Sequence, residues 1–208
     1  MDRVSKWAAG TNYGPVLTPT ELYLLRDVQL ELHPVMRNED DEFFLTFNLS
    51  NGSTTGTRPG GDGRELEFTA KSEPATVPRV SELVIITHRS PWCTLVRNPD
   101  GVTCGDVCET LFQDYEKEVT PAEFATLNPR AQDSINRYRD QAIRAQAGGW
   151  AAGGYFSQAA VSPNRIRRAD WLTDHIIFDK LARVESQYAR QRLGFNAPNI
   201  ICLYLTRY

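Results

Sequence analysis

The pattern of apolar and polar residues predicts strands through the first half of the chain and one more at its end. Each is marked by period-two alternation or by a run of β-branched and aromatic side chains. They are residues 28–32, 43–49, 65–68, 82–88, 93–97 and 200–205. The last run is apolar throughout, so we expect it to lie buried within the sheet.

Helix start signals follow the strands. Thr103 precedes Asp106 by three residues, which is the spacing of a capping box, ahead of apolar residues at three-and-four spacing. Thr120 and Glu123 repeat that box, with Pro121 at the first helical position. These signals predict one helix beginning near residue 103 and a second, short one beginning near residue 120.

The second half of the chain reads mostly as helix. A longer helix rich in Arg and Gln is expected from the Asn128-Pro129 break to about residue 147, and another around residues 183–193. The pattern leaves the structure of residues 165–172 open. Strands in a run, then helices, then a closing strand indicate an α+β fold with a mainly antiparallel sheet and helices packed on one face.

The domain organisation is simple. We expect an irregular N-terminal arm over residues 1–27 and a single α+β domain over residues 28–208. Within that domain, residues 50–63 contain five glycines and no apolar side chain to pack, which is typical of a mobile loop.

Composition places the chain among ordinary globular proteins. Of its 208 residues, 41% are hydrophobic and 24% charged. The N-terminus lacks the apolar core of a signal peptide, and no stretch approaches the roughly 18 apolar residues of a membrane span. We therefore expect a cytoplasmic protein with no membrane association and, with only four cysteines, no structural disulfide.

Charge divides unevenly between the two halves. Residues 1–120 contain 11 Lys and Arg against 19 Asp and Glu, whereas residues 121–208 contain 12 against 7. All but one of the later cations are arginines, whose planar fork suits phosphate, carboxylate and aromatic faces. The C-terminal half is either a set of solvated helix faces or a surface for an anionic partner such as RNA.

Several kinds of site are excluded or disfavoured by spacing. Neither the glycines of residues 50–63 nor those of residues 148–154 have the spacing of a nucleotide-binding loop, so we expect no nucleotide cofactor. Cys104 and Cys108 lie four apart on one helix face, but no matching pair of ligands accompanies them, and two buried thiols explain them better than zinc. No Gly-x-Ser-x-Gly nucleophile motif occurs. We expect no metal and no other cofactor.

The most informative stretch is residues 162–172, which follow a glycine-rich segment with aromatic residues. In one interpretation Arg168 and Asp170 form a structural ion pair and Trp171 belongs to the core. In the other the stretch is a site in which arginines hold phosphate, an aromatic ring stacks on a base and a carboxylate stabilises positive charge on a ribose. The candidate substrate-binding residues are Trp150, Tyr155, Arg165, Arg167 and Trp171.

Short elements in one order carry a resemblance to a known family. They are Ser90-Pro91-Trp92, Gly101 and Thr103 before a helix with Val107, residues 119–124 (Val-Thr-Pro-Ala-Glu-Phe) and residues 167–172 (Arg-Arg-Ala-Asp-Trp-Leu). Over roughly residues 28–205 the chain resembles a domain family of unknown function that is common in mushroom-forming fungi. It departs from that family at Ala169, at Trp171 and over residues 175–178. The resemblance implies a fold and a fungal origin, and no activity.

A second resemblance, by type alone, is to a shiitake ribosome-inactivating toxin, an rRNA N-glycosylase of similar size. Residues 185–190 also resemble the Glu…Ala-Arg helix of plant ribosome-inactivating proteins, although Glu185 and Arg190 are five apart where those proteins have three. The resemblance implies removal of an adenine from large-subunit ribosomal RNA. Asp170 or Glu185 would supply the carboxylate, and Arg168 or Arg190 the cation.

The alternative is a non-enzymatic interaction or storage domain, in which the same arginines form surface and the same aromatic residues form core. In both cases we expect a monomer. Ribosomal RNA is the expected partner of the enzyme.

Overall fold

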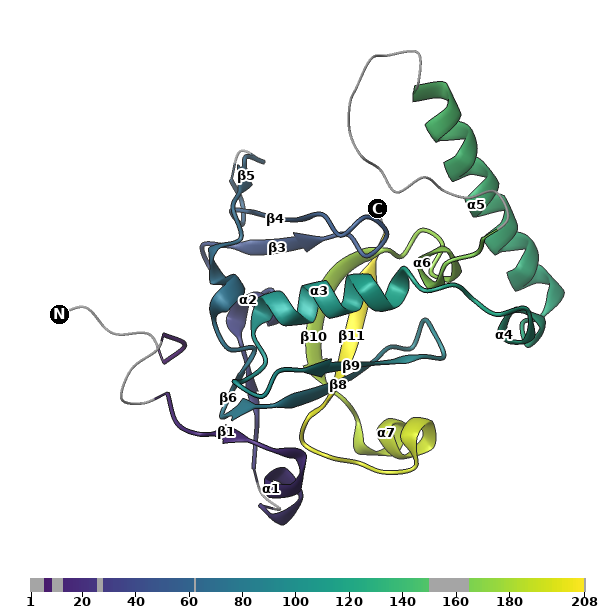
Figure 1. The fold of residues 1–208 in the computed structure, drawn as a ribbon. Helices are drawn as coiled ribbons and strands as arrows, with labels where there is room; N and C mark the ends of the chain where they lie inside the picture. The colour runs from purple at the N-terminus through teal and green to yellow at the C-terminus, as the bar shows by residue number, and fades with distance from the viewer. Residues whose placement is uncertain (1–5, 9–12, 26–27, 62, 150–164, 208) are drawn as a thin grey trace.

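A four-stranded sheet lies at the centre of the structure, a computed structural model that describes residues 6–8, 13–25, 28–61, 63–149 and 165–207 (Figure 1). Its strands are β8 (Glu82–Ile86), β9 (Cys93–Arg97), β10 (Ile177–Arg183) and β11 (Ile200–Thr206), in the order β10-β11-β8-β9. β11 is parallel to β8, and the other pairs are antiparallel. The expected α+β fold with a mainly antiparallel sheet is confirmed, and the apolar final strand lies between two others.

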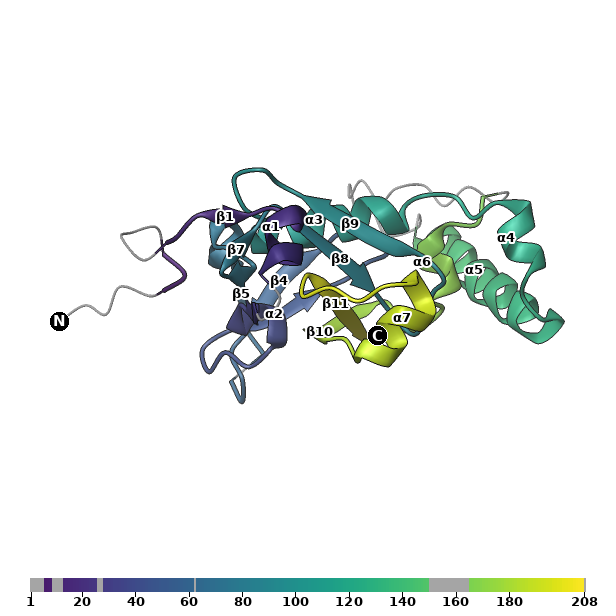
Figure 2. The same cartoon turned by 90° about the horizontal axis from the view of Figure 1, so that it is seen from below.

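The other elements surround this sheet (Figures 1 and 2). They are β1 (Val16–Leu17), α1 (Pro19–Leu24), β2 (Glu31–Leu32), α2 (Pro34–Arg37), β3 (Phe44–Phe47), β4 (Thr54–Thr57), β5 (Glu65–Leu66), the 3-10 helix η1 (Thr69–Ser72), β6 (Thr76–Val77), β7 (Arg79–Val80), α3 (Cys104–Tyr115), α4 (Pro121–Ala125), α5 (Pro129–Gly149), α6 (Arg168–Trp171) and α7 (Ser186–Leu193). β3, β4 and β5 form an antiparallel sheet, β2 pairs with β6, and β1 pairs with β7.

The two faces of the central sheet bury different cores. Leu83 and Ile85 of β8 point into the main core, which also contains Leu111 of α3. Alternate residues of a strand face opposite ways, so Val84 and Ile86 enter a smaller core with α7. α3 therefore lies on one face and α7 packs against the other, so the helices are not confined to the single face expected from the sequence.

Both predicted capping boxes form. Thr103 accepts from the Asp106 backbone N–H and the Asp106 carboxylate accepts from the Thr103 N–H, which starts α3. Thr120 and Glu123 make the same pair at α4. No helix in the described part of the chain is long and apolar enough to cross a membrane.

Two predictions about irregular segments are wrong. The N-terminal arm of residues 1–27 contains β1 and α1, and α1 starts with a third capping box between Thr18 and Glu21. Residues 50–63, predicted as a mobile loop, contain β4, whose β-branched threonines pair with β3. Gly56 suits this strand because a Cβ there would lie 2.0 Å from the ring of Phe43.

β10 was not predicted from the sequence. Phe178 and Leu181 are both buried although they are three residues apart, because a register shift between Phe178 and Lys180 breaks the alternation. Asp179 and Lys180, which lie between Phe178 and Leu181, further obscure the strand pattern in the sequence.

Candidate functional site

α6 carries the core of the predicted site, and two backbone hydrogen bonds attach it to the segment after α3. Val119 N–H donates to the Ile166 carbonyl (2.8 Å), and Arg168 N–H donates to the Lys117 carbonyl (2.9 Å). Ala169 of the helix is buried in the main core. The arginines around α6 are thus fixed between the end of α3 and the core.

Arg167 is held on three sides. Its guanidinium bonds to Glu116 and donates to the Ser50 carbonyl (3.1 Å), and it lies 3.5 Å from the Asp170 carboxylate. Asp170, buried, accepts from the Arg167 backbone N–H (2.7 Å) and so caps α6. Each of the two charges thus has an oppositely charged partner within the protein, although the buried Arg167 Nε makes no hydrogen bond in the described residues.

Arg168 pairs with a different carboxylate from the one expected. Its guanidinium lies 3.7 Å from Asp114 and 4.7 Å from the centre of the Trp92 ring. Asp114, buried at the end of α3, also accepts from Thr94 Oγ1 (2.6 Å) and from Lys117 Nζ (2.5 Å). The pairing proposed between Arg168 and Asp170 is therefore wrong, because α6 directs Arg168 toward α3.

Trp171 belongs to an aromatic contact rather than to an open stacking surface. Its ring meets that of Trp92 edge to face, with centroids 4.9 Å apart. Trp92 Nε1 donates to Glu123 (2.7 Å), which holds this pair to α4. That bond and those from Thr120 lower the pKa of Glu123.

The remaining predicted residues separate into three groups. Arg165 joins the α6 cluster, since it donates to the Glu116 carbonyl (2.9 Å). Arg190 belongs to α7 and Glu185 is its N-cap, on the opposite face of the sheet, so the structure does not bring them to α6. Trp150 and Tyr155 lie outside the described residues.

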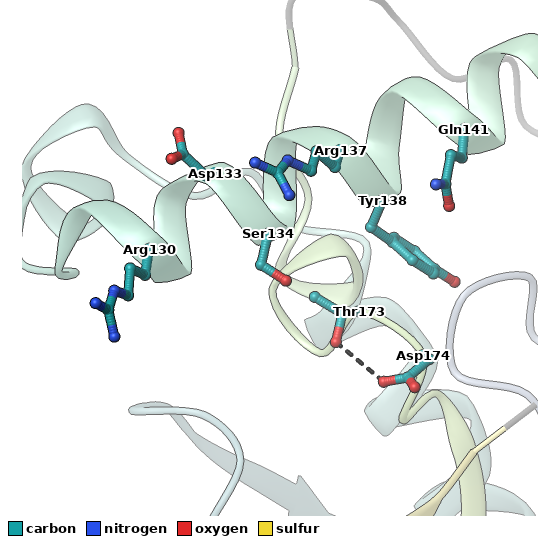
Figure 3. Close-up of a pocket in the computed structure, with 8 residues that line it drawn as sticks. All are labelled: Arg130, Asp133, Ser134, Arg137, Tyr138, Gln141, Thr173 and Asp174. Atoms are coloured by element: carbon teal, nitrogen blue, oxygen red, sulfur yellow. Dashed lines mark hydrogen bonds between the residues drawn. The ribbon is translucent and has the colours of Figure 1, made fainter.

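An open cavity of about 460 Å³ lies beside α6, between α5 and the turn that leads into β10. Figure 3 shows Ser134 and Tyr138 pointing from α5 toward Thr173 and Asp174, while Asp133 points away from them. Burial, followed by the charges of Asp170 and Asp174, raises the pKa of Tyr138. We call this space the α5 cavity.

Arginines recur at regular spacing along α5. Arg130, Arg137 and Arg144 are spaced seven residues apart, or about 10 Å along the axis, and this spacing keeps them on one face. All three are exposed, and none forms an ion pair within the described part of the chain. Arg130 and Arg137 line the α5 cavity. We call these three residues the arginine stripe.

The far wall of the cavity is conformationally strained. Thr173 has a φ of 55°, a left-handed conformation that costs a β-branched residue on the order of 1–3 kcal/mol. Its hydroxyl lies 3.2 Å from the Asp174 carboxylate, which also contacts His175 (2.7 Å) and Arg207 (3.2 Å). Although desolvation raises the pKa of Asp174, these neighbours together lower it below its usual value. The cavity thus holds an ionised carboxylate opposite a tyrosine.

A family model for a family of unknown function, DUF6699, matches residues 45–191. The chain belongs to this family. Neither the curated proteins nor the solved structures contain a significant match to it.

The family match spans β3 to most of α7 and therefore includes α5, α6 and the α5 cavity. The predicted membership of an uncharacterised domain family is confirmed. The cavity residues were not predicted from the sequence, although the seven-residue spacing of Arg130, Arg137 and Arg144 is visible in it. That α5 and residues 173–174 line one cavity depends on tertiary contacts, which the sequence does not show.

Proposed function

We propose that this domain binds RNA through the arginine stripe and the α5 cavity. The observation that carries the proposal is a row of three exposed arginines without carboxylate partners in the described residues, two of them beside an open polar cavity. Arginines in a row suit a phosphate backbone, and a neighbouring aromatic ring suits a splayed base.

The contents of the cavity support a nucleotide as the unit bound. Its volume of about 460 Å³ lies in the range of small-molecule pockets, roughly 300–1,000 Å³. Tyr138 offers a ring for stacking, and Gln141 offers an amide for the edge of a base. By contrast, Arg167, Arg168, Asp170 and Trp171 are occupied by internal contacts, which supports a structural role for α6.

A salt titration tests this proposal. Binding of a labelled single-stranded oligoadenylate should weaken steeply as salt rises, and Arg137→Ala should reduce the slope of log K against log salt by about 0.7. Arg89→Ala, which removes an exposed arginine between β8 and β9, is the matched control and should leave the slope unchanged. Equal slopes for the two variants would show that the arginine stripe does not contact the RNA phosphates.

The rRNA N-glycosylase activity predicted from sequence is the second candidate. It is favoured by one observation, namely that the α5 cavity is lined by a tyrosine, an arginine and an ionised carboxylate. Hydrolysis would break the bond between C1′ and the adenine N9. Water would give its oxygen to C1′ and a proton to the departing base. Asp174 would stabilise the cationic ribose that forms as this bond breaks, before water adds. Arg137 would lie near the leaving base and stabilise its negative charge.

Treatment of ribosomes separates the two candidates. For the enzyme, incubation followed by acidic aniline should release one discrete rRNA fragment, and Asp174→Asn should abolish it while leaving oligoadenylate binding intact. A protein that binds the oligonucleotide but yields no fragment is a binding domain.

A further inference from the structure

A groove between β2 and β10 is independent of α5 and α6. One cavity of about 470 Å³ is lined by residues 29–32 on one side and residues 180–183 on the other. A second cavity, of about 250 Å³, continues it toward Pro198 and shares Gln29, Leu30 and Arg183 with the first. We call the two together the β2–β10 groove.

Both walls of the groove are strand edges. β10 pairs with β11 on its other side, and within the described residues no other backbone segment pairs with residues 180–183. β2 pairs with β6, and the His33 N–H donates to the Ala75 carbonyl. Because backbone groups alternate along an antiparallel ladder, Leu30 and Leu32 direct theirs toward the groove.

The Leu30 backbone carbonyl in the groove is bonded to a side chain, and no strand in the described part of the chain pairs with it. The Leu30 carbonyl accepts from the Arg183 guanidinium (3.1 Å), a side-chain bond that crosses the groove. Buried Leu32 and Leu181 give the groove an apolar floor.

The charges along the groove favour an acidic occupant. Its two carboxylates are already neutralised, Glu31 by Lys6 (2.6 Å) and Glu39 by Arg37 (2.6 Å). Lys180 and Arg183 have no carboxylate partner in the described residues.

We propose that the β2–β10 groove binds an acidic peptide in extended conformation, which adds a strand between β2 and β10. A backbone N–H of the peptide would donate to the Leu30 carbonyl in place of the Arg183 guanidinium. The released guanidinium and Lys180 would then bind acidic side chains of the peptide. Strand addition of this kind draws affinity from main-chain hydrogen bonds and specificity from alternate side chains.

Three peptides test the mode of binding. The first is a fluorescein-labelled peptide of alternating Val and Glu, the second has Lys in place of Glu, and the third is the acidic peptide with alternate amides N-methylated. The acidic peptide should bind best, and N-methylation should abolish binding because it removes the backbone donors. Equal binding of all three would overturn the proposal.

Variants of the protein locate the site. Lys180→Glu should weaken binding of the acidic peptide by about tenfold, which corresponds to about 1.4 kcal/mol of binding free energy. Arg89→Glu should leave the affinity for this peptide unchanged. Lys180 is exposed, so the fold should tolerate the change, and Lys180→Gln gives a milder second variant. Hydrogen exchange should slow on binding at residues 29–32 and 180–183. Protection confined to α5, or unchanged affinity of Lys180→Glu, would contradict this site.

Discussion

Arg168 is the residue at which a binding role and a structural role predict opposite results. Its contacts with buried Asp114 and with the Trp92 ring indicate a structural role. Arg168→Ala should lower the free energy of unfolding by about 2 kcal/mol, less than a fully stranded charge would cost, because Lys117 still contacts Asp114.

Thermal unfolding and oligoadenylate binding should be measured on the same Arg168→Ala protein. A lower Tm with unchanged binding is expected, and Arg190→Ala, on the exposed side of α7, should change neither. Unchanged stability together with lost binding would return Arg168 to the candidate site.

Buried His33 should make the free energy of unfolding depend on pH. Its Nδ1 accepts from the Val35 N–H (3.2 Å), so the neutral ring carries its proton on Nε2 and donates to Glu73 (2.8 Å). Burial lowers the pKa of His33, against the opposing effects of Glu73 and Asp40. The unfolded chain therefore binds more protons below about pH 6.5, and the free energy of unfolding should fall as pH decreases through that range.

His33→Asn, which retains a capping side chain, should remove part of this pH dependence. Urea denaturation at several pH values from neutral downward measures it, and His88→Asn, at an exposed histidine, provides the comparison. Identical pH profiles for wild type and His33→Asn would contradict the assignment.

At the scale of elements, capping decides where helices begin. α3 packs in the main core through residues such as Leu111, whereas α4 has no buried residue. Thr103→Ala should therefore destabilise the protein by about 1–2 kcal/mol, and Thr120→Ala by less. The denaturant midpoints of the two variants measure these losses. Thr103→Ser should restore most of the stability lost in Thr103→Ala. An unshifted midpoint for Thr103→Ala would show that the cap does not contribute to stability.

At the scale of the whole molecule, burial divides the four free thiols. Cys93 is exposed on the edge strand β9, whereas Cys104, Cys108 and Cys202 are buried. Burial raises the pKa of Cys108 to about 12, so its reactive thiolate is scarce as well as shielded. A thiol reagent such as DTNB should modify one cysteine quickly in the native protein and all four after unfolding.

Cys93→Ser should remove the fast phase of that reaction. Rapid modification of several thiols in the native protein would show that the sheet opens more readily than its buried core suggests.

Local signals in the sequence determined much of the fold. The boxes at Thr103 and Thr120 fix helix starts because capping joins residues only three apart. The apolar run at residues 200–205 predicts a buried strand, and residues 200–203 are buried, whereas Tyr204 is exposed and Leu205 half-buried. The box at Thr18 held the same information and shows that α1 was predictable too.

Only the tertiary structure decided the partners. Arg167 and Arg168 are neighbours in sequence, yet one pairs with Asp170 and the other with Asp114, because a helical turn directs adjacent side chains to different surroundings. The bulge in β10, the α5 cavity and the β2–β10 groove likewise join segments distant in the chain. Sequence periodicity reports which face of an element is buried, but which segment covers that face depends on packing the whole chain together.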